Sequence, residues 1–101
     1  MYHLNILPIA FEDIKSNANW YSTQKKGLGL GLKFTRAVRS EIKKIINNPY
    51  AFVNRYDKHH TCVMKKYPYM IHYIIDDELK TITITAVFST KQSPDIWYSR
   101  R

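Results

Sequence analysis

The chain has 101 residues and a mass of 12.0 kDa, and 45% of its residues are apolar and 14% aromatic. This composition excludes a disordered chain and favours a single domain over residues 1–101. No run of about 18 apolar residues offers a membrane span. The first residues lack a basic segment and soon meet Glu12 and Asp13, unlike a signal peptide, and the lone Cys62 excludes an intrachain disulfide. We therefore expect a cytoplasmic protein.

The formal net charge is +8, and it is concentrated in one segment. Residues 24–66 hold eleven basic side chains against two acidic ones, Glu41 and Asp57, whereas the remainder is nearly balanced. Such clustering is typical of a surface that faces a polyanion. The alternative interpretation is a solvated helix face that contacts nothing.

The N-terminal part predicts a short edge strand over Tyr2–Leu7, followed by a helix that starts at Pro8. We expect Glu12 and Asp13 in the first helical turn, where the helix dipole favours anions, and the helix to end before Gly27. Its apolar positions recur every three or four residues, at Ile9, Ala10, Ile14, Ala18 and Tyr21.

A second, longer helix is predicted after the glycine-rich connection at Gly27–Gly31, which matches no phosphate-binding loop. Its apolar stripe is Leu30, Phe34, Val38, Ile42 and Ile45, and Asn47-Asn48-Pro49 ends it. Basic residues lie off this stripe. The candidate nucleic-acid-binding residues are Lys33, Arg36, Lys43, Lys44 and, further along the chain, Lys66.

After a polar and aromatic connection over residues 50–58, the apolar period changes to two. Three strands are predicted, over His59–Lys66, Tyr69–Asp76 and Leu79–Phe88. In the last strand, Ile82, Ile84, Ala86 and Phe88 are expected on one face. Since the connections are too short for crossovers, the strands form an antiparallel meander on the two helices. The predicted class is α+β, with an antiparallel sheet of about four strands in the order β-α-α-β-β-β.

Metal binding is one possible use of the residues His59, His60, Cys62 and His72, but in a strand only His60 and Cys62 share a face. Ordinary packing within the sheet is the favoured interpretation, and no metal site is predicted.

Metal-free RNA cleavage needs a base for the 2′-hydroxyl, an acid for the departing 5′ oxygen and fixed cations for the developing charge. The sheet and the C-terminal segment offer suitable groups at His59, His60, Lys65, Lys66, Lys91, Tyr98, Arg100 and Arg101. Tyr56, Tyr67 and Trp97 offer rings for unpaired bases. Core and cross-strand packing is the alternative for Tyr67, Tyr69 and Tyr73.

Several segments in order resemble the RelE/ParE superfamily of bacterial type II toxin–antitoxin toxins. They are Ala10, Asp13-Ile14, Trp20-Tyr21, Gln24, GLGLGLKF, NNPYAF, KKYPYMIHYII, ITITAVFSTKQSP and Trp97. The resemblance covers almost the whole chain. It implies two helices against an antiparallel sheet, and a cognate antitoxin that holds the toxin inactive.

The RelE-like branch of the superfamily cleaves mRNA in the ribosomal A site without a cofactor. For that branch the resemblance implies catalytic roles for His60, Lys65, Lys91 and Tyr98. His60 stands near a position where an arginine is usual, so Lys65 is expected to supply the missing positive charge. The ParE-like branch inhibits DNA gyrase without catalysis, through a binding patch such as Ile96-Trp97-Tyr98. A nucleic-acid-binding module without toxicity is a third interpretation.

Overall fold

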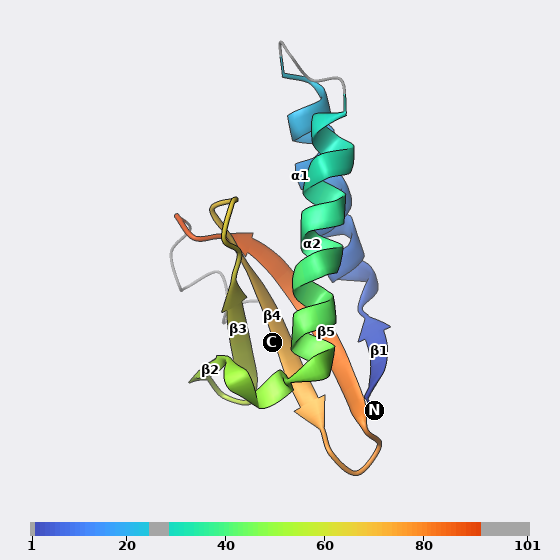
Figure 1. The fold of residues 1–101 in the computed structure, drawn as a ribbon, viewed down its shortest axis with the longest axis vertical. Helices are drawn as coiled ribbons and strands as arrows, with labels where there is room; N and C mark the ends of the chain where they lie inside the picture. The colour runs from blue at the N-terminus through green and yellow to red at the C-terminus, as the bar shows by residue number, and fades with distance from the viewer. Residues whose placement is uncertain (1, 25–28, 92–101) are drawn as a thin grey trace.

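The computed structural model describes residues 2–24 and 29–91. The elements in chain order are β1 (His3–Ile6), α1 (Pro8–Ser22), α2 (Leu30–Asn47), the short 3-10 helix η1 (Pro49–Ala51), β2 (Val53–Tyr56), β3 (His59–Val63), β4 (Tyr69–Asp76) and β5 (Thr81–Ser89). Figure 1 shows the two α-helices side by side against one face of the sheet, with their far turns extending beyond its end. Neither helix in the described ranges has the length and apolar composition of a membrane span.

The five strands follow the order β1-β5-β4-β3-β2, which confirms the α+β class. All neighbouring pairs are antiparallel except β1 with β5, which is parallel. A parallel pair is possible here because both helices lie between these strands in sequence and provide the crossover. The sheet has one strand more than predicted, since β2 was expected to be loop. Its four mostly exposed residues give no alternating apolar signal.

Helix α1 begins at Pro8, as predicted, because a proline at the first helical position loses no intrahelical hydrogen bond. The expectation for Glu12 and Asp13 was wrong: the first turn holds no acidic residue, and both lie in the second turn. The side chain of Asp13 contacts the sheet: its Oδ2 accepts a hydrogen bond of 3.0 Å from the backbone N–H of Val87 in β5.

Helix α2 buries Phe34, Val38, Ile42 and Ile45, which confirms the predicted apolar stripe. They form the core together with Ile71 of β4, Ile82 and Ile84 of β5, and other residues of the helix-facing side of the sheet. Gly31 allows the two helices to approach closely. A Cβ atom at this position would lie 2.5 Å from the carbonyl oxygen of Ala18 in α1.

The prediction of which side chains of β5 share a face is correct only for the first half of the strand. Ile82 and Ile84 join the helix-side core, as does Val87, which was expected on the opposite face. The cause is an irregularity in the β4–β5 ladder, where His72 pairs with Ala86 and Tyr73 with Ile84. Thr85 is skipped in this pairing, so the alternation of faces inverts after it.

Strand β3 is shorter than predicted and ends at Val63, not at Lys66. The backbone N–H of Met64 still reaches the Tyr69 carbonyl oxygen at 2.9 Å, and the residues between them form a loop. Lys65 and Lys66 therefore belong to the β3–β4 loop and not to a strand. This loop passes beside α2 (Figure 1).

Candidate functional site

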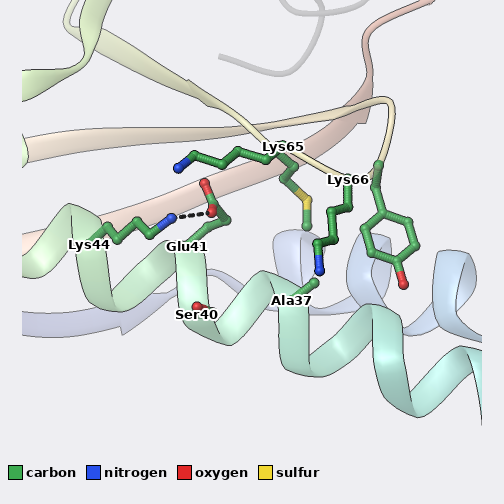
Figure 2. A pocket seen from close by; sticks show the side chains of 8 residues that line it. Ala37, Ser40, Glu41, Lys44, Lys65 and Lys66 are labelled. Carbon is green, nitrogen blue, oxygen red and sulfur yellow. Dashed lines mark hydrogen bonds and ion pairs between the residues drawn. The ribbon is translucent and has the colours of Figure 1, made fainter.

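A cavity of about 200 Å³ lies between α2 and the β3–β4 loop. We call it the α2 pocket. It is lined by Ala37, Ser40, Glu41 and Lys44 of the helix and by Met64, Lys65, Lys66 and Tyr67 of the loop. Figure 2 shows Lys65 reaching across from the loop toward the carboxylate of Glu41, while Lys66 extends toward the helix near Ala37. Three ammonium groups thus reach one cavity from two elements.

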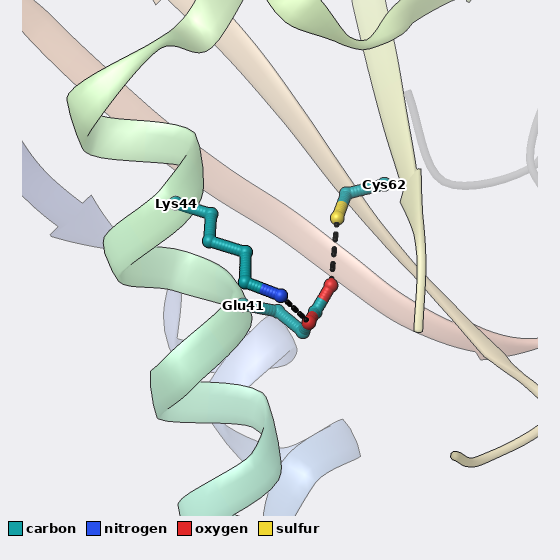
Figure 3. A network of polar contacts seen from close by, with 3 residues as sticks. All are labelled: Glu41, Lys44 and Cys62. Carbon is teal, nitrogen blue, oxygen red and sulfur yellow. Dashed lines mark hydrogen bonds and ion pairs between the residues drawn. The ribbon is translucent and has the colours of Figure 1, made fainter. Parts of the chain in front are cut away.

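Glu41 is the acidic group of this pocket, and its residue is only 8% exposed. One carboxylate oxygen accepts a hydrogen bond from Lys44 Nζ at 3.0 Å, and the other accepts one from Cys62 Sγ of β3 at 3.3 Å (Figure 3). The hydrogen bond to Glu41 raises the pKa of Lys44. Burial, followed by the bond to Glu41, raises the pKa of the Cys62 thiol to about 12. Lys44 is therefore held as a cation, and Cys62 as a neutral thiol.

The lining of the α2 pocket carries three lysine ammonium groups and one carboxylate, which gives a formal charge of +2. Glu41 and Met64 are buried, whereas Lys44, Lys65 and Lys66 are exposed at the rim. A rim of partly hydrated ammonium groups over a smaller buried negative charge attracts anions by Coulomb interaction. Such an arrangement can hold a phosphate or a carboxylate group.

The predicted basic side of α2 divides into two rows. Lys33 and Lys44 share a row with the pocket residues Ala37 and Ser40, because these positions follow one another at steps of four, three and four. Arg36 and Lys43 are also exposed, and at about 100° per residue they lie about 100–120° around the helix axis from Ala37. The helix therefore presents cations both at the pocket and on its outer surface.

Lys91 lies at the same end of the sheet as the α2 pocket. Its neighbour Thr90 donates a backbone hydrogen bond of 2.8 Å to the carbonyl oxygen of Pro68, in the β3–β4 loop. Lys91 itself is exposed. The predicted catalytic residue Tyr98 and the aromatic residue Trp97 lie outside the described residues.

His60 is placed away from that end of the sheet. Its ring packs on Tyr73, with ring centroids 5.4 Å apart, and its Nδ1 lies 2.8 Å from the carbonyl oxygen of Phe52. Since a carbonyl oxygen only accepts, Nδ1 is the protonated nitrogen and Nε2 is basic in the neutral ring. His60 lies near the start of β3, whereas Lys65 lies in the loop that follows the end of this strand at Val63. His60 contacts Phe52 and Tyr73, whereas Lys65 lines the α2 pocket.

Cys62 lies apart from His59 and His72, which both contact the side chain of Tyr56. Cys62 faces α2 and Glu41, whereas the Nδ1 of the buried His72 is hydrogen-bonded to the hydroxyl of Tyr56 at 2.8 Å. His59 stacks on the Tyr56 ring, with centroids 4.5 Å apart. No group of three potential metal ligands occurs within residues 2–24 and 29–91. Tyr67 packs edge-on against Phe34 and Tyr21, so its ring is partly used by the core.

Sequence reasoning missed two charged residues. Glu41 lies seven residues after Phe34 and three after Val38, so its position beside the apolar stripe was a usable signal for a buried carboxylate. Arg55 of β2 donates from Nε to Thr61 Oγ1 at 2.6 Å and supplies an arginine next to β3. No sequence signal pointed to it, because β2 was expected to be loop.

The fold itself has close counterparts among solved structures. A chain of the chromosomal ParDE TA system from P. aeruginosa matches with a TM-score of 0.76 at 16% identity, over 88% of this chain and 96% of that one. The chain has the RelE/ParE fold. A chain of the intact E. coli RelBE toxin–antitoxin complex matches with a TM-score of 0.68 at 14% identity, over 91% and 100% of the two chains.

The isolated E. coli RelE toxin matches this RelE/ParE fold as well, with a TM-score of 0.66 at 13% identity, over 98% of this chain and 95% of that one. No family model and no curated protein sequence matches the chain. The likeness thus lies in the arrangement of helices and strands. At these sequence identities it does not identify the site residues, which depend on the geometry of this chain.

Proposed function

We propose that this protein is the toxin of a type II toxin–antitoxin system and that it arrests growth in the cytoplasm by cleaving mRNA on the ribosome. The fold is shared with the E. coli RelE toxin and with a chain of a ParDE system. The RelBE structure is a toxin–antitoxin complex, which supports an antitoxin as the partner of this chain.

The observation that carries the proposal is the convergence of Lys44, Lys65 and Lys66 on the α2 pocket. Lys91 lies at the same end of the sheet, next to the contact between Thr90 and Pro68. Cleavage without a metal requires fixed cations to stabilise the charge of the phosphorane-like transition state. We assign this role to Lys65 and Lys91.

Proton transfer needs separate groups. In the proposed reaction the 2′-hydroxyl gives up its proton to a base and its oxygen attacks the adjacent phosphorus, while the bond to the 5′ oxygen breaks and that oxygen takes up a proton from an acid. Tyr98 is the proposed acid, following the family resemblance. His60 has the tautomer of a general base, but it does not belong to the lining of the α2 pocket and contacts Phe52 and Tyr73 instead.

The position of His60 outside the lining of the α2 pocket is the specific observation that favours a second candidate. A gyrase inhibitor needs a protein-binding surface and no convergence of acid, base and cation. The ParDE match fits that candidate equally well at the level of fold.

A cell-free translation reaction distinguishes the two candidates. The purified full-length chain is added to an end-labelled message with and without ribosomes, and new 5′ ends are mapped. The nuclease proposal predicts new ends only when ribosomes are present, and their loss in Lys65→Ala and Lys91→Ala. An intact message together with blocked supercoiling by purified gyrase would replace the nuclease proposal with gyrase inhibition.

A further inference from the structure

Glu41 gives the α2 pocket a feature that the proposed function does not use. Its carboxylate occupies the floor of a cavity whose rim is formed by Lys44, Lys65 and Lys66. An ion pair alone needs one lysine, and Lys44 already supplies it at 3.0 Å. The other two ammonium groups are in excess of the negative charge.

We propose that the α2 pocket binds a phosphate group of single-stranded RNA, and that Glu41 is a built-in competitor that weakens this binding. This inference rests on the proposed function for its choice of RNA as the ligand. The excess charge of the lining is +2, and the Ser40 hydroxyl adds a neutral hydrogen-bond donor. An incoming phosphate oxygen and Glu41 Oε1 then compete for the protons of Lys44 Nζ.

The surroundings of the pocket favour a strand over a single small anion. Lys33 and Lys44 lie in one row of α2, eleven residues apart, which spans roughly 16 Å along the helix. Lys91 extends the positive charge beyond the loop on the other side. A row of this length suits several successive phosphates, and a free phosphate ion would use only the pocket. Tyr67 and Met64 supply apolar lining beside the cations, where a sugar or base can pack.

The geometry of Glu41 allows a test by gain of affinity. In Glu41→Gln the side chain keeps its size and an oxygen that accepts from Lys44, while the negative charge is removed. At the few ångströms that separate the pocket groups, loss of one repulsive charge in a partly hydrated site corresponds to about a three- to tenfold change in affinity. Damage to the pocket would weaken binding there, so a gain of affinity that is lost again when Lys65 and Lys66 are replaced is the opposite of the effect of lost structure.

The experiment titrates the full-length chain with a fluorescent 2′-O-methyl RNA hexamer, which cannot be cleaved. Glu41→Gln is expected to tighten binding about three- to tenfold, and Lys65→Ala with Lys66→Ala to weaken it at least tenfold. The matched control pair is Lys15→Ala with Lys58→Ala, which removes the same charge from exposed lysines elsewhere and is expected to change affinity less than twofold. A methylphosphonate hexamer, which lacks the backbone charge, is expected not to bind.

Equal affinity of wild type and Glu41→Gln, or equal loss in the pocket and control pairs, would overturn the inference. Saturation by inorganic phosphate with no preference for the hexamer would identify a free-anion site, and preferred binding of polyglutamate would identify a protein ligand; either would also overturn it. Message cleavage that is unchanged in Lys44→Ala and Lys66→Ala would overturn the inference and the assignment of the cleavage site to the α2 pocket, but not the cleavage activity itself. Hexamer binding at the pocket, together with a message that stays intact in the presence of ribosomes, would overturn the proposed cleavage activity and leave the pocket as an RNA-binding site.

Discussion

At the scale of single residues, the polar groups that the fold buries are tied to identifiable partners. Cys62 and Lys44 share the carboxylate of Glu41, and Asp13 holds the backbone of Val87. Cys62 and Asp13 each link a helix to the sheet, and Glu41 fixes the position of the Lys44 ammonium group on α2. Because the pKa values of Cys62 and Lys44 are raised in the folded chain, the ionisation of these two groups is coupled to folding.

Alkaline pH is expected to destabilise the protein through Cys62. Its pKa is raised from 9.0 to about 12 in the folded chain, so the unfolded chain releases this proton first. Stability should therefore fall as the pH rises from about 9 toward 12. Urea unfolding at pH 8 and pH 10.5 measures this, and Cys62→Ala should lower the dependence by about one proton per molecule. The remaining slope comes from the other groups whose pKa is raised in the folded chain, among them Tyr50, whose bond to Asp77 raises its pKa to about 12, and the buried Tyr73. An unchanged slope in Cys62→Ala would contradict the assignment.

Acid is expected to act through Asp77, in the β4–β5 turn. Its carboxylate accepts hydrogen bonds from the hydroxyl groups of Tyr2, at 2.7 Å, and of Tyr50, and the bond from Tyr50 contributes most to lowering its pKa below 3.8. Its contribution should be complete above pH 3.8 and be lost as the pH falls through the lowered pKa. Asp77→Asn should thus reduce Tm by a few degrees at pH 7 and by less at pH 2. Glu78→Gln is the neighbouring control, and a difference that is constant with pH would rule out this role.

At the scale of elements, the sequence predicted both helices and the β3-β4-β5 meander, because apolar stripes with periods near four and two are determined by local spacing. Strand β2, the irregularity at Thr85 and the early end of β3 could not be predicted in this way. They depend on pairing with strands distant in sequence. The α2 pocket was missed for the same reason, since Lys65 and Lys66 lie in it only because β3 ends at Val63.

The contact between α1 and α2 depends on Gly31. In Gly31→Ala the added Cβ would lie 2.5 Å from the Ala18 carbonyl oxygen and 2.1 Å from Ser22 Oγ, so one helix must move. Overpacking of this kind costs about 1–3 kcal/mol and outweighs the gain in helix propensity, which is at most about 1 kcal/mol. Chemical denaturation should show a clear loss of stability, while the exposed Ser16→Ala of α1 changes it by less than about 0.5 kcal/mol. A Gly31→Ala variant more stable than the wild type would contradict this prediction, because it would mean that the two helices move apart at little cost in free energy.

The exposed basic surface of α2 should account for part of the salt dependence of RNA binding. Lys33→Glu with Arg36→Glu is expected to weaken binding and to flatten the slope of log affinity against log salt concentration, by about 0.7 for each phosphate of a single strand that the protein no longer neutralises. Titrations of the non-cleavable hexamer between low and high salt give this slope. Lys15→Glu with Lys58→Glu serves as the charge-matched control. An unchanged slope in the α2 variant would mean that this surface is merely solvated.

At the scale of the whole molecule, opposite charges gather at opposite ends of the sheet. The β3–β4 loop carries Lys65 and Lys66 beside α2. At the other end, Asp76 of β4 and the turn residues Asp77, Glu78 and Lys80 together carry a formal charge of −2 (Figure 1). A polyanion such as ribosomal or messenger RNA is therefore attracted to the lysine end and repelled from the other. This polarity agrees with the basic segment at residues 24–66, but the sequence alone did not show that its parts meet at one pocket.

Growth of bacteria in which the chain is expressed from an inducible promoter tests the proposed toxin activity most directly, with transcript 5′ ends sequenced before and after induction. We predict rapid arrest accompanied by new 5′ ends within coding regions, and relief of both in Lys65→Ala at equal protein level. Normal growth with unchanged 5′ ends in the presence of the folded protein would contradict the proposed function.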